Sequence, residues 1–191
     1  MKTPRTPAKN RWRAWACLVF TGVLICANNL PAQAPAPTDY QVKAAYLANF
    51  GRFVEWPPRS GPSQDQSFNV CVLGDDPFGP ALDAALAGET INRAPLVPRR
   101  ITKPREATNC RIVFITLSED SHLKTMLPPL ENAGVLTVSD IPQFARRGGM
   151  IELVLAGNKV RFEINVAATA RAGLTLSSEL LKLAVVVRKT L

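Results

Sequence analysis

The chain has 191 residues, of which 47% are hydrophobic and 20% are charged, a composition typical of a folded globular protein. Its net charge of +8 is concentrated at the start, because residues 1–34 hold five basic residues and no acidic ones. Removing these five from the 23 basic residues of the chain leaves 18 against 15 acidic residues, a net charge of only +3. A charge this small excludes an extended nucleic-acid interface, since such an interface neutralises many phosphates.

Residues 1–34 have the three parts of an export signal. A basic stretch ends at Arg13, a mostly apolar run follows from Ala14 to Ala27, and small residues occur at Ala32-Gln33-Ala34. The apolar run has fourteen residues, whereas a helix needs roughly 20 to span a bilayer. We interpret residues 1–34 as a cleaved signal peptide, with a retained N-terminal anchor as the alternative. The mature chain, residues 35–191, is then expected to be a single exported domain without stable membrane insertion.

Export changes the expected state of the cysteines. Cys17 and Cys26 lie in the signal, so the mature chain keeps Cys71 and Cys110. Two thiols in an oxidising compartment suggest one disulfide, and the strand-like sequences around them could bring the residues together. A pair of buried, unpaired thiols is the alternative. The chain has no C-x-x-C motif and a single histidine, His122, so we expect neither a thiolate–imidazole metal site nor a bound cofactor.

The first predicted helix follows a Pro/Ala linker at 34–37. Thr38-x-x-Gln41 is a capping-box pattern, and Trp56-Pro57-Pro58 marks the end of the helix. Between these signals an apolar stripe recurs at helical spacing, at Val42, Tyr46, Phe50, Phe53 and Val54. We interpret this aromatic face as core rather than as a ligand cage.

Strand and helix patterns alternate through the rest of the chain. The predicted order is strand 68–73, helix 77–87, edge strand 90–101, strand 111–116, helix 119–131 interrupted by two prolines, and strand 135–138. Two further strands, 150–155 and 159–164, flank the hairpin signal Ala156-Gly157-Asn158. A last helix is predicted over 177–189, burying Leu180, Leu183, Ala184 and Val187.

This order of elements predicts an α/β fold with one domain and three layers. A mostly parallel sheet is flanked by helices, because strands that alternate with helices pair in parallel. The C-terminal hairpin adds antiparallel strands to that sheet.

Acidic residues follow two of the predicted strands, Asp75 and Asp76 after the first and Asp140 after the fourth. The carboxyl ends of parallel strands are where α/β sheets bind ligands, so these carboxylates could converge on a cation. Capping of the helices that follow is the interpretation we favour. Thr116 occupies the position where a phosphorylatable receiver domain needs an aspartate.

Two clusters of basic residues stand out, Arg99-Arg100-x-x-Lys103-x-Arg105 and Arg146-Arg147. Either cluster could meet an acidic protein surface, lipid headgroups or a cell-wall polymer. A solvated loop is the alternative for both.

The sequence does not support an enzyme. Asp120, Ser121 and His122 are neighbours in the chain, and neighbours on a helix project about 100° apart, so they cannot form a catalytic relay among themselves. The chain also lacks a G-x-S-x-G nucleophile motif and a P-loop.

The segment at 43–57 reads KAAYLANFGRFVEWP and resembles the N-terminal signature of the YfiR-type family of exported bacterial regulators. Other segments agree with that family in order: Cys71, Cys110, GGMI at 148–151, RFEIN at 161–165, GL at 173–174 and LLKLA at 180–184. Together they cover roughly residues 39–187, nearly the whole mature chain.

The resemblance implies a periplasmic protein, commonly a homodimer, that binds the periplasmic sensor region of a membrane-bound diguanylate cyclase. Binding represses the cyclase, which lowers cyclic di-GMP and biofilm formation. In this family a disulfide joins the strand cysteines, which carries over to Cys71 and Cys110. A second cysteine pair that some members have near the Gly-Gly hairpin has no counterpart at 144–151, which argues against switching that relies on two disulfides.

A periplasmic small-molecule-binding domain that feeds a receptor or transporter is the alternative function. The two functions differ in the surface that they need. An apolar pocket with convergent polar groups would favour the ligand-binding domain, whereas an exposed apolar patch would favour the adaptor.

Overall fold

The computed structural model describes residues 36–57 and 67–189, so the predicted signal peptide and the loop at 58–66 lie outside the described residues. The chain divides into two compact units, 1–36 and 37–191, and the second unit holds all the helices and strands described below. In residues 36–57 and 67–189 we find no helix with both the length and the hydropathy of a membrane span.

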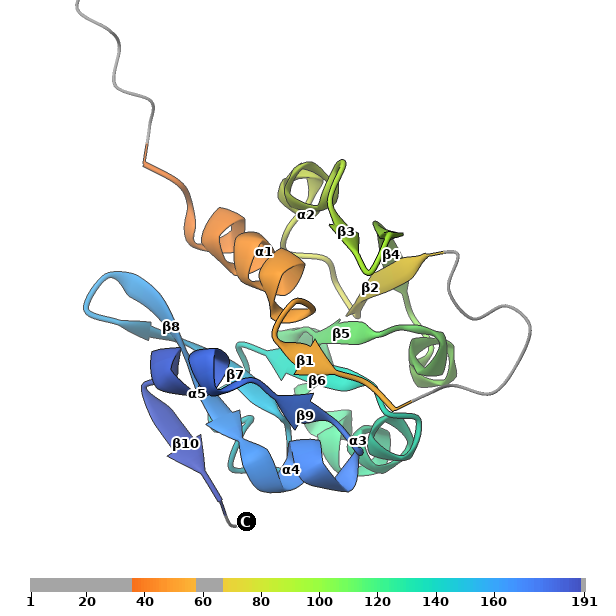
Figure 1. The fold of residues 1–191 in the computed structure, drawn as a ribbon, viewed down its shortest axis with the longest axis vertical. Helices are drawn as coiled ribbons and strands as arrows, with labels where there is room; N and C mark the ends of the chain where they lie inside the picture. The colour runs from red at the N-terminus through yellow and green to blue at the C-terminus, as the bar shows by residue number, and fades with distance from the viewer. Residues whose placement is uncertain (1–35, 58–66, 190–191) are drawn as a thin grey trace, which may run out of the picture. The chain divides into compact units, whose positions relative to one another are not determined.

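The elements of the second unit alternate as the sequence predicts (Figure 1). The helices are α1 (Asp39–Phe50), α2 (Pro80–Leu86), α3 (Leu123–Asn132), α4 (Val166–Arg171) and α5 (Ser178–Leu183), with 3₁₀ helices η1 (Pro104–Asn109) and η2 (Leu117–His122). The strands are β1 (Val54–Glu55), β2 (Phe68–Leu73), β3 (Thr90–Ile91), β4 (Ala94–Ile101), β5 (Ile112–Ile115), β6 (Leu136–Ser139), β7 (Ile151–Ala156), β8 (Lys159–Asn165), β9 (Thr175–Leu176) and β10 (Val186–Arg188).

Eight strands form the main sheet in the order β10-β8-β7-β6-β5-β2-β4-β3. The neighbouring strands β4, β2, β5, β6 and β7 pair in parallel, and β7 pairs with β8 in an antiparallel hairpin. Gly157 and Asn158 close this hairpin with positive φ angles of 53° and 61°, as the sequence signal predicts. The predicted fold class is confirmed.

The sheet separates two apolar cores. Val70 and Val72 of β2 point into the core that α1 and α2 cover, whereas Cys71 and Leu73 point into the core that α3 covers. This alternation follows from the two-residue period of a strand. All four side chains are fully buried, which explains why residues 70–73 read as an uninterrupted apolar run.

The capping box of α1 is confirmed. The Gln41 amide donates to Thr38 Oγ1 at 3.3 Å, and the Thr38 amide donates to Gln41 Oε1 at 2.7 Å. The helix ends at Phe50, earlier than predicted, and Val54 instead pairs with Leu176 of β9. The predicted extension to Val54 is wrong because this pairing lies over a hundred residues away in the sequence.

The predicted helix over 177–189 is also wrong in its second half. It ends at Leu183, and Val186–Arg188 forms β10, which pairs in parallel with β8. Three consecutive valines at 185–187 favour a strand, and the outer edge of β8 supplies the partner. Leu180 is buried as predicted, whereas Leu183 is 62% exposed.

Candidate functional site

An apolar groove of about 220 Å³ lies between α1, β8 and α5. Its walls are Val42, Ala45, Tyr46, Asn49, Phe50, Phe53, Phe162, Leu180 and Leu183. Most of the aromatic stripe that the sequence places in the core therefore lines this groove, with Phe50 fully buried and Tyr46 only half-buried.

The groove forms because α1 presents its small residues to the sheet. Ala44 and Ala48 are buried, with Leu47 between them, so the larger stripe lies on the flank of the helix. There Tyr46 and Phe50 meet Phe162 of β8, with ring centroids 5.5 Å and 5.4 Å from it at steep interplanar angles. Such edge-on aromatic contacts make the wall of the groove rigid.

The two polar side chains of the groove each donate a hydrogen bond to the backbone of the protein. The Tyr46 hydroxyl donates to the carbonyl of Val160 at 3.2 Å, and Asn49 Nδ2 donates to the carbonyl of Ala45 at 2.8 Å. Small-molecule sites occupy about 300–1,000 Å³ and carry a few polar groups that orient the ligand. The groove is smaller and less polar than that, which suits an apolar side chain of a protein partner better than a metabolite.

Exposed apolar residues follow α5 in the chain. The Ser177 hydroxyl caps α5 by accepting the Leu180 amide at 3.2 Å, and the helix ends at Leu183 in the rim of the groove. The three valines that follow are exposed by 49%, 36% and 37%. Exposed apolar residues that adjoin a groove are typical of a protein-binding surface. Sequence analysis missed this surface, although the run of three valines was a signal for it.

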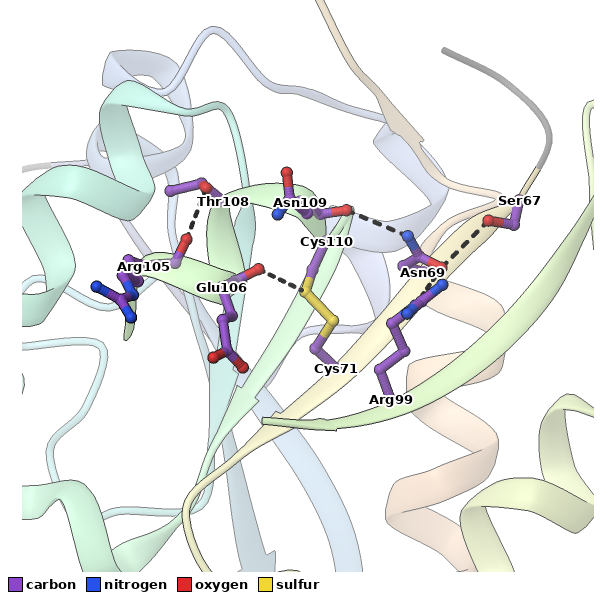
Figure 2. Close-up of a disulfide and its surroundings, with 9 residues drawn as sticks. All are labelled: Ser67, Asn69, Cys71, Arg99, Arg105, Glu106, Thr108, Asn109 and Cys110. Atoms are coloured by element: carbon purple, nitrogen blue, oxygen red, sulfur yellow. Dashed lines mark hydrogen bonds between the residues drawn. A yellow bond between two sulfur atoms is a disulfide. The ribbon is translucent and has the colours of Figure 1, made fainter. Parts of the chain in front are cut away.

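The structure joins Cys71 and Cys110 by a disulfide, with Cα atoms 6.0 Å apart (Figure 2). Cys71 lies in β2 and Cys110 lies just after η1, so the bond ties the start of β5 to its neighbour in the sheet. Asn69 supports the same junction, since its Nδ2 donates to the carbonyl of Asn109 at 3.3 Å and its Oδ1 accepts from Arg99 at 3.0 Å. Both cysteines are buried.

The carboxylates after the strands do not form a cation site. Among the described residues we find no cluster of three potential metal ligands. Asp140 accepts from Lys43 Nζ at 2.6 Å and from the Tyr40 hydroxyl at 3.0 Å, which fixes α1 to the end of β6. Burial, and then the charge of Asp140, raise the pKa of Tyr40 to about 12, so the hydroxyl keeps the proton that it donates.

The predicted caps at these acidic residues are wrong. Helix α2 begins at Pro80 with Gly79 as its cap, and Asp76 Oδ1 instead accepts from the Phe78 amide at 2.8 Å. The same carboxylate binds Arg100 through Oδ2 at 2.9 Å. The described residues just after Asp140 form turns rather than a helix, so the side chain is available to Lys43. Helix α2 begins at Pro80 rather than at Pro77, and ion pairs with Arg100 and Lys43 engage the carboxylates of Asp76 and Asp140.

The other candidates lie apart from the groove. His122 is exposed at the N-terminus of α3, with Nδ1 3.4 Å from Glu119 Oε2. In the first basic cluster, Arg100 is held by Asp76 and by Asp83. The hydrogen bond from Arg100 lowers the pKa of Asp83. The second cluster, Arg146-Arg147, lines a different cleft beside α3.

Two solved structures are similar to this chain. A conserved domain protein from Vibrio cholerae is 13% identical with a TM-score of 0.49, over 63% of this chain and 55% of its own. The ABC domain in complex with L-Trp from Streptococcus pneumonia is 10% identical with a TM-score of 0.45, over 62% of this chain and 54% of its own. The match thus spans about half the length of each of these proteins.

A family model gives a longer match. The model described as YfiR/HmsC-like matches residues 40–185, from α1 to the residue before β10. The match covers well over half of the chain and includes both cysteines of the disulfide and every residue that lines the apolar groove. The chain therefore belongs to the YfiR/HmsC-like family.

Proposed function

We propose that this protein is a periplasmic adaptor, acting as a homodimer, that binds the sensor region of a membrane-bound diguanylate cyclase. Binding represses the cyclase and so lowers cyclic di-GMP and biofilm formation. Family membership supports the class of function, and the apolar groove with the exposed valines of β10 supports a mechanism based on protein contact. The observation that carries the proposal is an apolar surface whose polar groups are already hydrogen-bonded within the chain.

Repression by contact has a thermodynamic requirement. An adaptor shifts its partner between two states only through its difference in affinity for those states. A shift from mostly active to mostly inactive cyclase, from 99:1 to 1:99, needs a difference of about 5.5 kcal/mol. Burial of an apolar side chain of the cyclase in the groove in one state only would contribute about 1.5–3 kcal/mol of that difference.

Substitution Leu183→Glu should abolish repression without unfolding the protein. The side chain is 62% exposed at the rim of the groove, so the charge stays hydrated in the free protein but loses water in the complex. We expect the affinity for the purified periplasmic region of the cyclase to fall at least about 30-fold, as at an interface hot spot. Calorimetric titration with that region measures the loss.

The matched control is Leu117→Glu. Leu117 is 64% exposed in η2 and does not line the groove, so this variant should bind the cyclase normally. In cells, deletion of the gene should raise cyclic di-GMP, and His122→Ala should repress as the wild type does because no catalytic side chain is required. Equal binding by both Leu→Glu variants would reject the groove as the interface, and loss of repression in His122→Ala at normal abundance would favour an enzyme.

The location of the protein gives an independent prediction. We expect the mature protein in the periplasmic fraction, with its N-terminus between Asn28 and Thr38, because the basic, apolar and small-residue parts of a signal precede it. Intact-mass analysis of that fraction measures the cleavage point. Retention of residues 1–34 would instead support an N-terminal anchor.

A further inference from the structure

A second cleft, of about 500 Å³, lies on the surface between α3, α4 and the loop at 140–150. Four basic side chains line it: Lys124, Arg146, Arg147 and Arg171. Lys124 and Arg146 are exposed, and their side chains make no hydrogen bond or ion pair with another described residue. The buried Leu127 forms part of the wall between them. Two unpartnered cations therefore face one hollow.

The other two cations are partly neutralised. Arg147 binds the carboxylate of Asp120, and its Nη2 donates to the Asp120 carbonyl at 2.9 Å. Arg171 donates from Nε to Glu131 at 2.8 Å, which leaves the terminal nitrogens of this guanidinium for another acceptor. Glu131 of the lining and Asp120, which is paired with Arg147, offset two of the four basic residues and leave a formal charge of +2 at the cleft.

The loop that carries Arg146 and Arg147 is held from inside. The buried carboxylate of Glu152 accepts the Gln143 amide at 2.9 Å and the Ala145 amide at 3.1 Å. Asn165, fully buried, donates from Nδ2 to the Ala145 carbonyl at 2.8 Å. Buried side chains thus fix the backbone on the N-terminal side of Arg146. A loop fixed in this way places its charges in the absence of ligand, which lowers the entropy cost of binding.

Beside Arg147, the backbone of the loop packs too tightly for a side chain. A Cβ atom at Gly149 would lie 2.1 Å from the ring of Phe144, which is itself fully buried. The Gly149 amide donates back to the Phe144 carbonyl at 2.9 Å. The backbone on the C-terminal side of Arg147 is therefore fixed as well.

We propose that this cleft binds a phosphate or diphosphate group. The side chains of Lys124 and Arg146, together with the terminal nitrogens of Arg171, match an anion with several oxygens and more than one negative charge. A single carboxylate would engage only one of these forks. The hollow shape favours a compact anionic group that enters between the walls. An anionic lipid headgroup and a soluble phosphate both carry such a group, and the experiment separates these two sources.

The test compares two double variants of the protein purified from cells that express the full chain. K124Q/R146Q removes the two unpartnered cations of the cleft, and K159Q/R161Q removes one lysine and one arginine from the exposed side of the β7–β8 hairpin. The probes are inorganic pyrophosphate, followed by calorimetry, and phosphatidylglycerol-containing vesicles, followed by co-sedimentation. Backbone NMR shifts at 145–149 on addition of pyrophosphate report contact with the cleft directly.

We expect saturable binding that weakens about tenfold or more in K124Q/R146Q, as expected for charge-assisted contacts, and that is unchanged in K159Q/R161Q. Salt should also weaken it. Loss of pyrophosphate binding would identify a soluble phosphate, and loss of vesicle binding alone would identify a headgroup. Absence of saturable binding to both probes, or an equal loss in both variants, would overturn the proposal. Cyclase binding is measured separately through Leu183→Glu, so the two proposals can fail independently.

Discussion

Reduction of the Cys71–Cys110 disulfide should lower the free energy of unfolding by about 4 kcal/mol. The bond closes a loop with a sequence separation of 39 residues, and the chain-entropy model assigns about that value to a loop of this size. Native domains are stable by only about 5–15 kcal/mol, so the loss is a large fraction of the total. For a domain of this length the melting temperature should fall by about 8–16 °C.

Thermal melting with and without reductant measures this effect. Cys71→Ser should reproduce the loss, and reductant should change nothing further in that variant, which makes it the matched control for side effects of the reductant. In cells the variant should be less abundant, and the proposed cyclase target would be released because its inhibitor is depleted. Two free thiols in peptide maps of periplasmic protein, or a melting temperature that reduction leaves unchanged, would contradict the prediction.

Substitution Phe162→Ala should destabilise the protein by about 3–5 kcal/mol. Phe162 is 2% exposed in β8, and its ring packs edge-on against both Tyr46 and Phe50. Truncation would remove both ring contacts and leave a cavity beneath the apolar groove, because α1 and β8 are both held by other contacts. Urea denaturation with an unchanged m-value measures the difference in stability.

Two further variants test whether the loss of stability comes from the buried volume of Phe162 or from the loss of any apolar side chain in the groove. Phe162→Leu keeps much of the volume and should cost about 1.5 kcal/mol or less. Leu183→Ala alters a mostly exposed residue of the same groove and should stay within about 0.5 kcal/mol of the wild type. A cost below about 1 kcal/mol for Phe162→Ala would mean that the three-ring cluster does not hold α1 against the sheet.

Local signals predicted most of the fold. The capping box at Thr38 and the Gly157-Asn158 hairpin depend on a few neighbouring residues, and both form as predicted. The central strands are buried on both faces, so their sequences are apolar runs that need no context. Two of the errors lie at β1 and β10, which are two and three residues long and form because distant strands pair with them.

The candidate site was less predictable for the same reason. The sequence identifies the aromatic stripe of α1, but which part is core depends on how far the helix is rotated against the sheet. Ala44 and Ala48 are the residues that face the sheet. A hydrophobic pattern gives more weight to the larger residues of the stripe, so it does not identify the two alanines as the buried face. Leu183 was predicted to be buried because the predicted helix continued through the residues that form β10. Apolar residues at helical spacing in that longer helix indicated a buried face, whereas Leu183 is exposed at the rim of the groove.

The last strand of the sheet is also the last described element of the chain. A chain that lacks Val186–Arg188 would leave Glu163, Ile164 and Asn165 of β8 without their parallel partners, and their unpaired backbone would be available to another chain. These three residues therefore protect part of a sheet edge, and their loss should favour association between copies of the chain through β8.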